Sequence, residues 1–116
     1  MSTFVNLTPH PVNIINDGEV VASYSSQGFA RVGETIRLQG FVMGDNRTTV
    51  NLSPVYQGEV EGLPEPEPET VYIVSRLTAQ AVKGREDIVF PLGEVRDEKG
   101  RILGVRGFGY FPVSDA

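Results

Sequence analysis

Short alternations of apolar and polar residues run through most of the chain, and glycine or proline separates them. An apolar residue at every second position is typical of a strand with one buried face. The segment at residues 71–74 (Val-Tyr-Ile-Val) is the most apolar, which favours a central strand. Strands are predicted over residues 4–7, 12–14, 20–24, 29–38, 48–60, 71–74, 88–90, 95–96, 101–103 and 105–111.

Several segments between these strands have the composition of turns. The Asp-Gly pair at residues 17 and 18 predicts a hairpin, because its turn needs residues that tolerate positive φ. Residues 97–100 end in glycine and predict a second tight turn. We expect Gly33 to bend the strand at 29–38, Pro54 to interrupt the strand at 48–60, and residues 40–46 to form a flexible turn.

One segment predicts a helix, at about residues 76–83, because it is rich in alanine and leucine. Ser75 can cap its start and Gly84 can end it. Residues 61–69 alternate glutamate with proline, which favours an exposed, extended connection inside one domain. Together the elements predict a β-rich α+β fold, with a mostly antiparallel sheet or small barrel-like domain over residues 1–116.

The end of the chain is rich in aromatic residues and glycine. Phe108, Tyr110 and Phe111 follow or flank three glycines. These rings are expected either to close the core or to form an oligomer contact. The glycines around Arg106 allow two interpretations: close approach of a ligand, or an edge strand that bends around the core.

The composition excludes several classes of protein. A chain of 116 residues without cysteine has no disulfide, thiolate metal site or cysteine nucleophile. A net charge of −5 argues against binding DNA or RNA polymers, which requires a basic face. No apolar run approaches the roughly 20 residues that span a bilayer, and the N-terminus does not resemble a signal peptide.

The cationic residues are strongly biased, with eight arginines and two lysines. Arginine is favoured where a phosphate or carboxylate is bound by two parallel hydrogen bonds, so the bias indicates a focused anion site. The alternative is that the arginines pair with the fifteen acidic residues on the surface. The candidate ligand-binding residues are Arg106, Arg96, Asp97, Phe90, Arg31 and Arg85, with Phe90 as a surface for base stacking or as part of the core.

Catalytic groups are scarce. His10, the one histidine, lies between two prolines without a nucleophile or orienting acid nearby in sequence, and we expect a structural role at a turn. Paired carboxylates such as Glu59 and Glu61 leave a hydrolase as a minor alternative. The expectation is therefore a protein that is not an enzyme and uses no metal or cofactor.

Five segments together resemble a family of small proteins encoded by phages and prophages. They are residues 6–10 (Asn-Leu-Thr-Pro-His), 28–32, 58–64, 71–75 and 96–102. In this order they are similar to the Thoeris anti-defence sponges of the first type. The resemblance implies a β-rich homo-oligomer, a dimer or hexamer, in the cytoplasm of the infected bacterial host. It also implies binding of cyclic ADP-ribose isomers from TIR enzymes, or of CBASS cyclic oligonucleotides, without cleavage.

The resemblance also suggests roles for particular residues. Arg106 is the best match to a phosphate-binding arginine. Arg96 and Asp97 lie where relatives often carry Arg-Asn, and the carboxylate disfavours a phosphate there, so Asp97 is expected to face a ribose hydroxyl or the turn. The alternative function is a phage structural or accessory protein without a small-molecule ligand.

Overall fold

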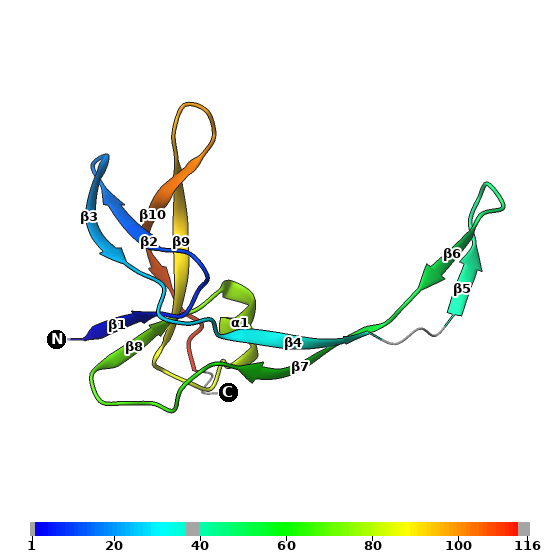
Figure 1. Cartoon of the computed structure of the whole chain (residues 1–116), viewed down its shortest axis with the longest axis horizontal. Coiled ribbons are helices and arrows are strands. Elements are labelled where there is room, and N and C mark those ends of the chain that lie inside the picture. Colours follow the sequence, from blue (N-terminus) through cyan, green and yellow to red (C-terminus); the bar gives the residue numbers. More distant parts are fainter. Residues whose placement is uncertain (1, 37–39, 114–116) are drawn as a thin grey trace.

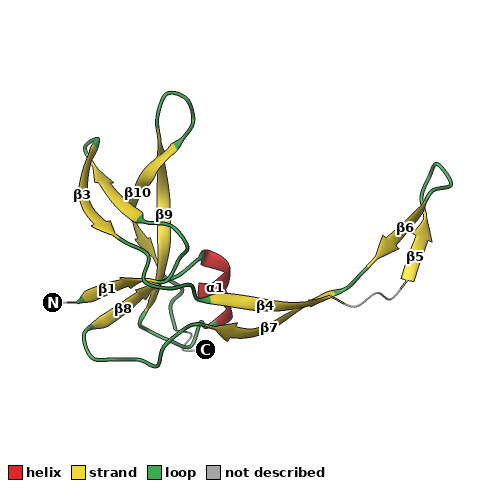
Figure 2. Cartoon of the chain, viewed as in Figure 1, coloured by secondary structure: helices red, strands yellow, loops and turns green. Residues whose placement is uncertain are grey.

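The computed structural model describes residues 2–36 and 40–113, which form a β-rich body and a long arm (Figures 1 and 2). The strands are β1 (Thr3–Asn6), β2 (Val12–Asn16), β3 (Glu19–Tyr24), β4 (Arg31–Ile36), β5 (Gly40–Met43), β6 (Thr49–Leu52), β7 (Val55–Glu61), β8 (Thr70–Ile73), β9 (Ile88–Arg96) and β10 (Ile102–Gly109), and the helix is α1 (Arg76–Ala81).

The body is a six-stranded sheet in the order β1-β8-β9-β10-β2-β3. β8 pairs in parallel with β1 and β9, β10 pairs in parallel with β2, and the β2–β3 and β9–β10 pairs are antiparallel. A parallel bridge between Asn6 and Ser26 joins the end of β1 to the segment after β3. The two edges of the sheet therefore meet, and the sheet is nearly closed as a barrel. This confirms the predicted β-rich, barrel-like fold with one short helix.

Local turn chemistry agrees with the sequence. Asp17 and Gly18 have φ of 51° and 78°, as a two-residue hairpin turn between β2 and β3 requires. Helix α1 begins after Ser75, whose hydroxyl oxygen accepts a hydrogen bond from the Thr78 N–H at 3.3 Å. The predicted hairpin and the predicted helix cap are confirmed.

Two predictions about strand boundaries are wrong. Residues 40–46 are not simply a turn, because β5 pairs with β6 along its whole length before the turn begins. β9 continues through Pro91 instead of ending there. β8 pairs with β9 only at Ile88 and Val89, so no ladder partner on that side loses a hydrogen bond to the proline.

Two groups of buried side chains hold the body together. One contains Leu7, Ala30, Tyr72, Val74, Ala79, Ile88 and Phe90, and the other contains Val12, Ile73 and Val105. Phe108 stacks on Phe4 with ring centroids 5.3 Å apart, and Phe111 stacks on Phe90 at 5.0 Å. Tyr110 remains 68% exposed. Two of the three C-terminal rings therefore close the core, while an oligomer contact stays a prediction.

The arm comprises two pairs of strands that lie outside the barrel. β4 and β7 form an antiparallel ribbon that leaves the body, and β5 and β6 form a hairpin at its far end (Figure 1). The register shifts between Val32 and Glu34, which places a bulge at the expected bend, Gly33. The radius of gyration is 18.4 Å, against about 13 Å for a compact chain of this length.

The side chain of Asn6 lies at the junction where the barrel closes, and it is fully buried. Its amide nitrogen donates to the carbonyl oxygens of His10 at 2.8 Å and Tyr24 at 2.9 Å. Its amide oxygen accepts from the Thr8 N–H at 2.9 Å and the Thr8 hydroxyl at 2.7 Å. One amide thus connects β1, the loop that follows it and the end of β3.

Replacing Asn6 with alanine is expected to lower the free energy of unfolding by roughly 3 kcal/mol, because buried carbonyls and an N–H lose their partners. Asn6→Asp should cost a similar amount, since a carboxylate oxygen would face the two carbonyls. Urea unfolding measures both effects. Asn51→Ala, at an exposed position of β6, is the matched control. Equal stability of Asn6→Ala and this control would contradict the assigned role.

Candidate ligand-binding site

A polar hollow of about 350 Å³ lies between the β2–β3 turn and the β9–β10 hairpin. Its lining consists of Ile15, Asn16, Asp17, Gly18, Val95 and Arg106. β10 pairs in parallel with β2 at Val105 and Ile14, which brings Arg106 beside the residues that lead into the turn. The hollow therefore combines a guanidinium, an amide and a carboxylate with two apolar side chains.

A glycine positions Arg106. Gly93 on β9 lies opposite Arg106 in the antiparallel ladder and has φ of 83°. A Cβ atom at Gly93 would lie 3.3 Å from Cβ, 3.6 Å from Cγ and 3.7 Å from Cδ of Arg106. The stem of the arginine therefore extends across the space that the glycine leaves open, and Arg106 is part of the lining of the hollow.

The other arginines help to decide between surface pairing and a focused site. Ion pairs join Arg31 to Glu61, Arg85 to Asp87, Arg96 to Glu94 and Arg101 to Asp97. Within residues 2–36 and 40–113, no carboxylate forms such a pair with Arg106. Surface pairing thus accounts for four arginines, while Arg47, Arg76 and Arg106 form no such pair among the described residues.

The guanidinium of Arg85 is bound by neighbouring groups of the protein. Its Nε and Nη2 donate to the two carboxylate oxygens of Asp87 at 2.9 and 2.6 Å, and Nη1 donates to the Pro64 carbonyl at 3.0 Å. The hydrogen bond to Asp87 raises the pKa of Arg85. Burial raises the pKa of Tyr72, whose ring lies under the same guanidinium. Arg85 therefore ties the glutamate-proline connection to the body.

Arg96 and Asp97 lie together at the β9–β10 turn. Arg96 donates to Glu94 and to the Gly100 carbonyl, both at 2.7 Å. Asp97 Oδ1 accepts from the N–H groups of Lys99 at 2.8 Å and Arg101 at 2.9 Å. These hydrogen bonds, first that from the Arg101 backbone, lower the pKa of Asp97. The sequence analysis expected Asp97 to face either a ribose hydroxyl or the turn, and its side chain faces the turn.

The remaining two candidates, Phe90 and Arg31, are not part of the lining of the hollow. Phe90 is 4% exposed in the core, between Phe111 and the guanidinium of Arg76, whose carbon is 5.3 Å from the ring centroid. Arg31 lies at the base of the arm, where its side chain is 62% exposed. The structure thus brings Arg96 and Asp97 together, but it does not gather the six candidates into one site.

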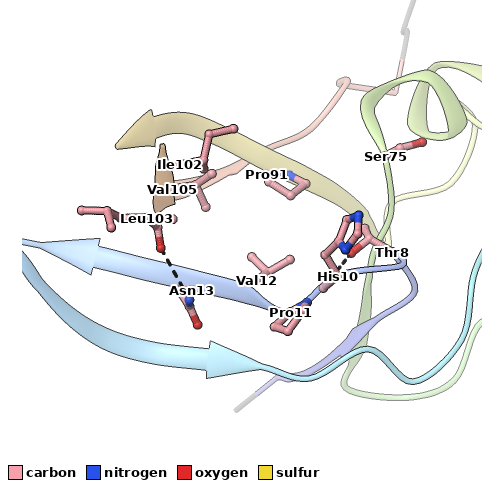
Figure 3. A pocket seen from close by; sticks show the side chains of 11 residues that line it. Thr8, His10, Pro11, Val12, Asn13, Ser75, Pro91, Ile102, Leu103 and Val105 are labelled. Atoms are coloured by element: carbon pink, nitrogen blue, oxygen red, sulfur yellow. Dashed lines mark hydrogen bonds between the residues drawn. The ribbon is translucent and has the colours of Figure 1, made fainter. Parts of the chain in front are cut away.

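A second hollow, also of about 350 Å³, is an apolar groove on the body (Figure 3). Val12 on β2 faces Pro91 and Val105 across it, His10 and Thr8 lie at one end, and Ile102 and Leu103 lie at the other. The backbone carbonyl of His10 accepts a hydrogen bond from Asn6, while the His10 ring lines the groove, so the expected structural role of this side chain stays a prediction. The lining of this groove contains no aspartate, glutamate, lysine or arginine.

Residues 2–36 and 40–113 contain no group of three histidine, cysteine, aspartate or glutamate side chains placed to hold a metal ion. Nor does any helix in this part of the chain have the length and apolar character needed to cross a membrane.

Sequence reasoning identified Arg106 but missed the residues that surround it, chiefly Asn16, Val95 and Gly93. The local signals for the two hairpins were present, yet nothing in the sequence placed these hairpins side by side. A glycine within an apolar strand pattern was the one available signal, because such a glycine often marks a close approach.

Comparisons with protein-family models, with curated proteins and with solved structures find no match to this chain. Fold and site together describe a nearly closed β-barrel that carries an arm and a polar hollow with Arg106 in its lining.

Because the pKa of Asp97 is lowered in the folded protein, its contribution to stability is present above the pKa of an unfolded aspartate, near 3.9. The contribution is lost as the pH falls through the lower, folded value. We expect Asp97→Asn to lose part of the acid dependence of thermal unfolding, and differential scanning calorimetry from pH 7 to about pH 2.5 would measure it. An Asp45→Asn protein is the control, and identical pH profiles for both variants would contradict this assignment.

Proposed function

We propose that this protein binds a cyclic nucleotide immune signal and sequesters it without cleavage. The proposal rests on the position of Arg106. This residue lines a polar hollow, and its guanidinium forms no ion pair with a carboxylate among the described residues. The ligands are cyclic ADP-ribose isomers from TIR enzymes or the cyclic oligonucleotides of CBASS, in agreement with the family resemblance. The proposed setting is a homo-oligomer in the cytoplasm of an infected bacterium.

The lining of the hollow supports this chemistry. A guanidinium can donate two parallel hydrogen bonds to a phosphodiester or pyrophosphate, which Arg106 would provide. Asn16 and Asp17 offer an amide and a carboxylate for ribose hydroxyls, and Ile15 and Val95 offer apolar contact to a base. The hollow has a volume of about 350 Å³, which is at the small end for ligand pockets. A cyclic nucleotide would therefore also contact groups outside the hollow.

One observation favours the alternative function, a structural or accessory protein of a phage. The arm extends far from the barrel and exposes apolar side chains, as do proteins whose task is assembly. A protein that occurs in purified particles and binds none of the nucleotides would support this alternative.

The test is calorimetry of the purified protein with cyclic ADP-ribose isomers and with cyclic di- and trinucleotides. Arg106→Ala should weaken binding by about 30-fold or more, because a charged hydrogen-bonding group is lost. Arg106→Lys should recover only part of the affinity, since an ammonium cannot form the paired contact. Arg101→Ala is the control, since that side chain is exposed and paired with Asp97.

The fate of the ligand separates sequestration from catalysis. After heat denaturation of the complex, recovery of the unchanged nucleotide is expected. A chemically altered nucleotide would indicate an enzyme. Wild-type affinity in Arg106→Ala would remove the hollow from the proposal.

A further inference from the structure

The far end of the arm exposes apolar side chains that make no core. Val50 and Leu52 on β6 are 45% and 55% exposed, and Val55 at the start of β7 is 54% exposed. Val50 and Leu52 are two residues apart on one strand, so they lie on the same face of the hairpin. This face, together with Val55, is called the arm face below.

Among the described residues, neither cluster of buried side chains includes a residue of this hairpin. β5 and β6 form a two-stranded sheet without a third strand. An isolated two-stranded hairpin is at best marginally stable in water and needs packing against something else. The free energy gained by covering the arm face is therefore available to an intermolecular contact.

The body of the same chain carries a matching surface. The apolar groove of Figure 3 is lined by Pro11, Val12, Pro91 and Val105, and its rim includes Ile102 at 55% and Leu103 at 49% exposure. Figure 1 shows the hairpin of β5 and β6 at the end of the arm far from β2, β9 and β10. The arm therefore does not cover the groove of its own chain.

The two surfaces also match in charge. The 18 residues from 40 to 57 contain one acidic residue, Asp45, and one basic residue, Arg47, although 22% of the whole chain is charged. The groove lining contains no charged residue. Burying two uncharged apolar surfaces against each other costs little desolvation free energy. Neither surface offers the positive charge that binding a nucleic acid would need.

We propose that the arm face docks into the apolar groove of a second copy of this chain, and that the second copy returns the same contact. A two-fold axis then relates the chains, and the reciprocal exchange closes the assembly instead of propagating it. The inference specifies the homo-oligomer of the proposed function, but it does not depend on the nucleotide ligand. It is tested without ligand, so its failure and that of the nucleotide proposal are distinguishable.

The first experiment is sedimentation equilibrium of the full chain without nucleotide. The wild type should have the mass of a dimer at micromolar concentration. Leu52→Asp should be monomeric or dissociate at least tenfold more readily, because a carboxylate would enter an apolar groove. Asn51→Asp, which adds the same charge on the opposite face of β6, should remain a dimer. A monomeric wild type, a larger ring or a dimeric Leu52→Asp protein would each overturn the proposal.

The second experiment locates the contact and does not depend on the stability of Leu52→Asp. The natural chain has no cysteine, so Leu52→Cys and Leu103→Cys proteins can be mixed and treated with a short bismaleimide. A covalent pair of one chain of each kind is expected. Gln80→Cys, exposed on α1, replaces Leu103→Cys as the control and should give far less product. Equal yields from Leu103→Cys and Gln80→Cys would show that the arm does not reach the groove.

Discussion

The Asn6 side chain satisfies all its hydrogen-bonding groups inside the protein, and the closure of the barrel depends on it. A buried amide is costly unless each donor and acceptor is paired, so the partners must hold one arrangement. Those partners belong to the loop after β1 and to the end of β3, the two edges of the sheet. The polar requirement of one residue thus determines where the sheet closes and how the loop before β2 approaches it.

The candidate site follows from the order of strands that this closure permits. β10 lies between β9 and β2, so the β9–β10 and β2–β3 hairpins become neighbours and leave a polar hollow between them. Arg106 reaches the hollow because the opposite position on β9 is Gly93. Arg85 instead pairs with Asp87 and fastens the glutamate-proline connection to the body. Arginine therefore serves a structural contact in one place and lines the polar hollow in another.

The arm and the barrel differ in how far their apolar side chains are buried. The barrel buries its apolar residues in two clusters, while the far end of the arm keeps Val50, Leu52 and Val55 exposed. The apolar groove beside Val12 has the same uncharged character. Mutual burial of these surfaces would give a pair of barrels joined by exchanged arms. Such a pair would place each hollow at a fixed distance from its copy, which suits a protein proposed to bind ligand as an oligomer.

The sequence by itself determined the features that arise within a few residues. The Asp17-Gly18 turn, the cap at Ser75 and the turn at Asp97 depend on local φ preferences and short hydrogen bonds, which residue type decides. Strand boundaries at 40–46 and at Pro91 were predicted wrongly, because pairing partners decided them. Only the tertiary structure decided that β10 pairs in parallel with β2, that Arg106 alone of the six candidates lines the hollow, and that the arm extends from the barrel. These features depend on contacts between residues far apart in the chain, whose energy no local pattern contains.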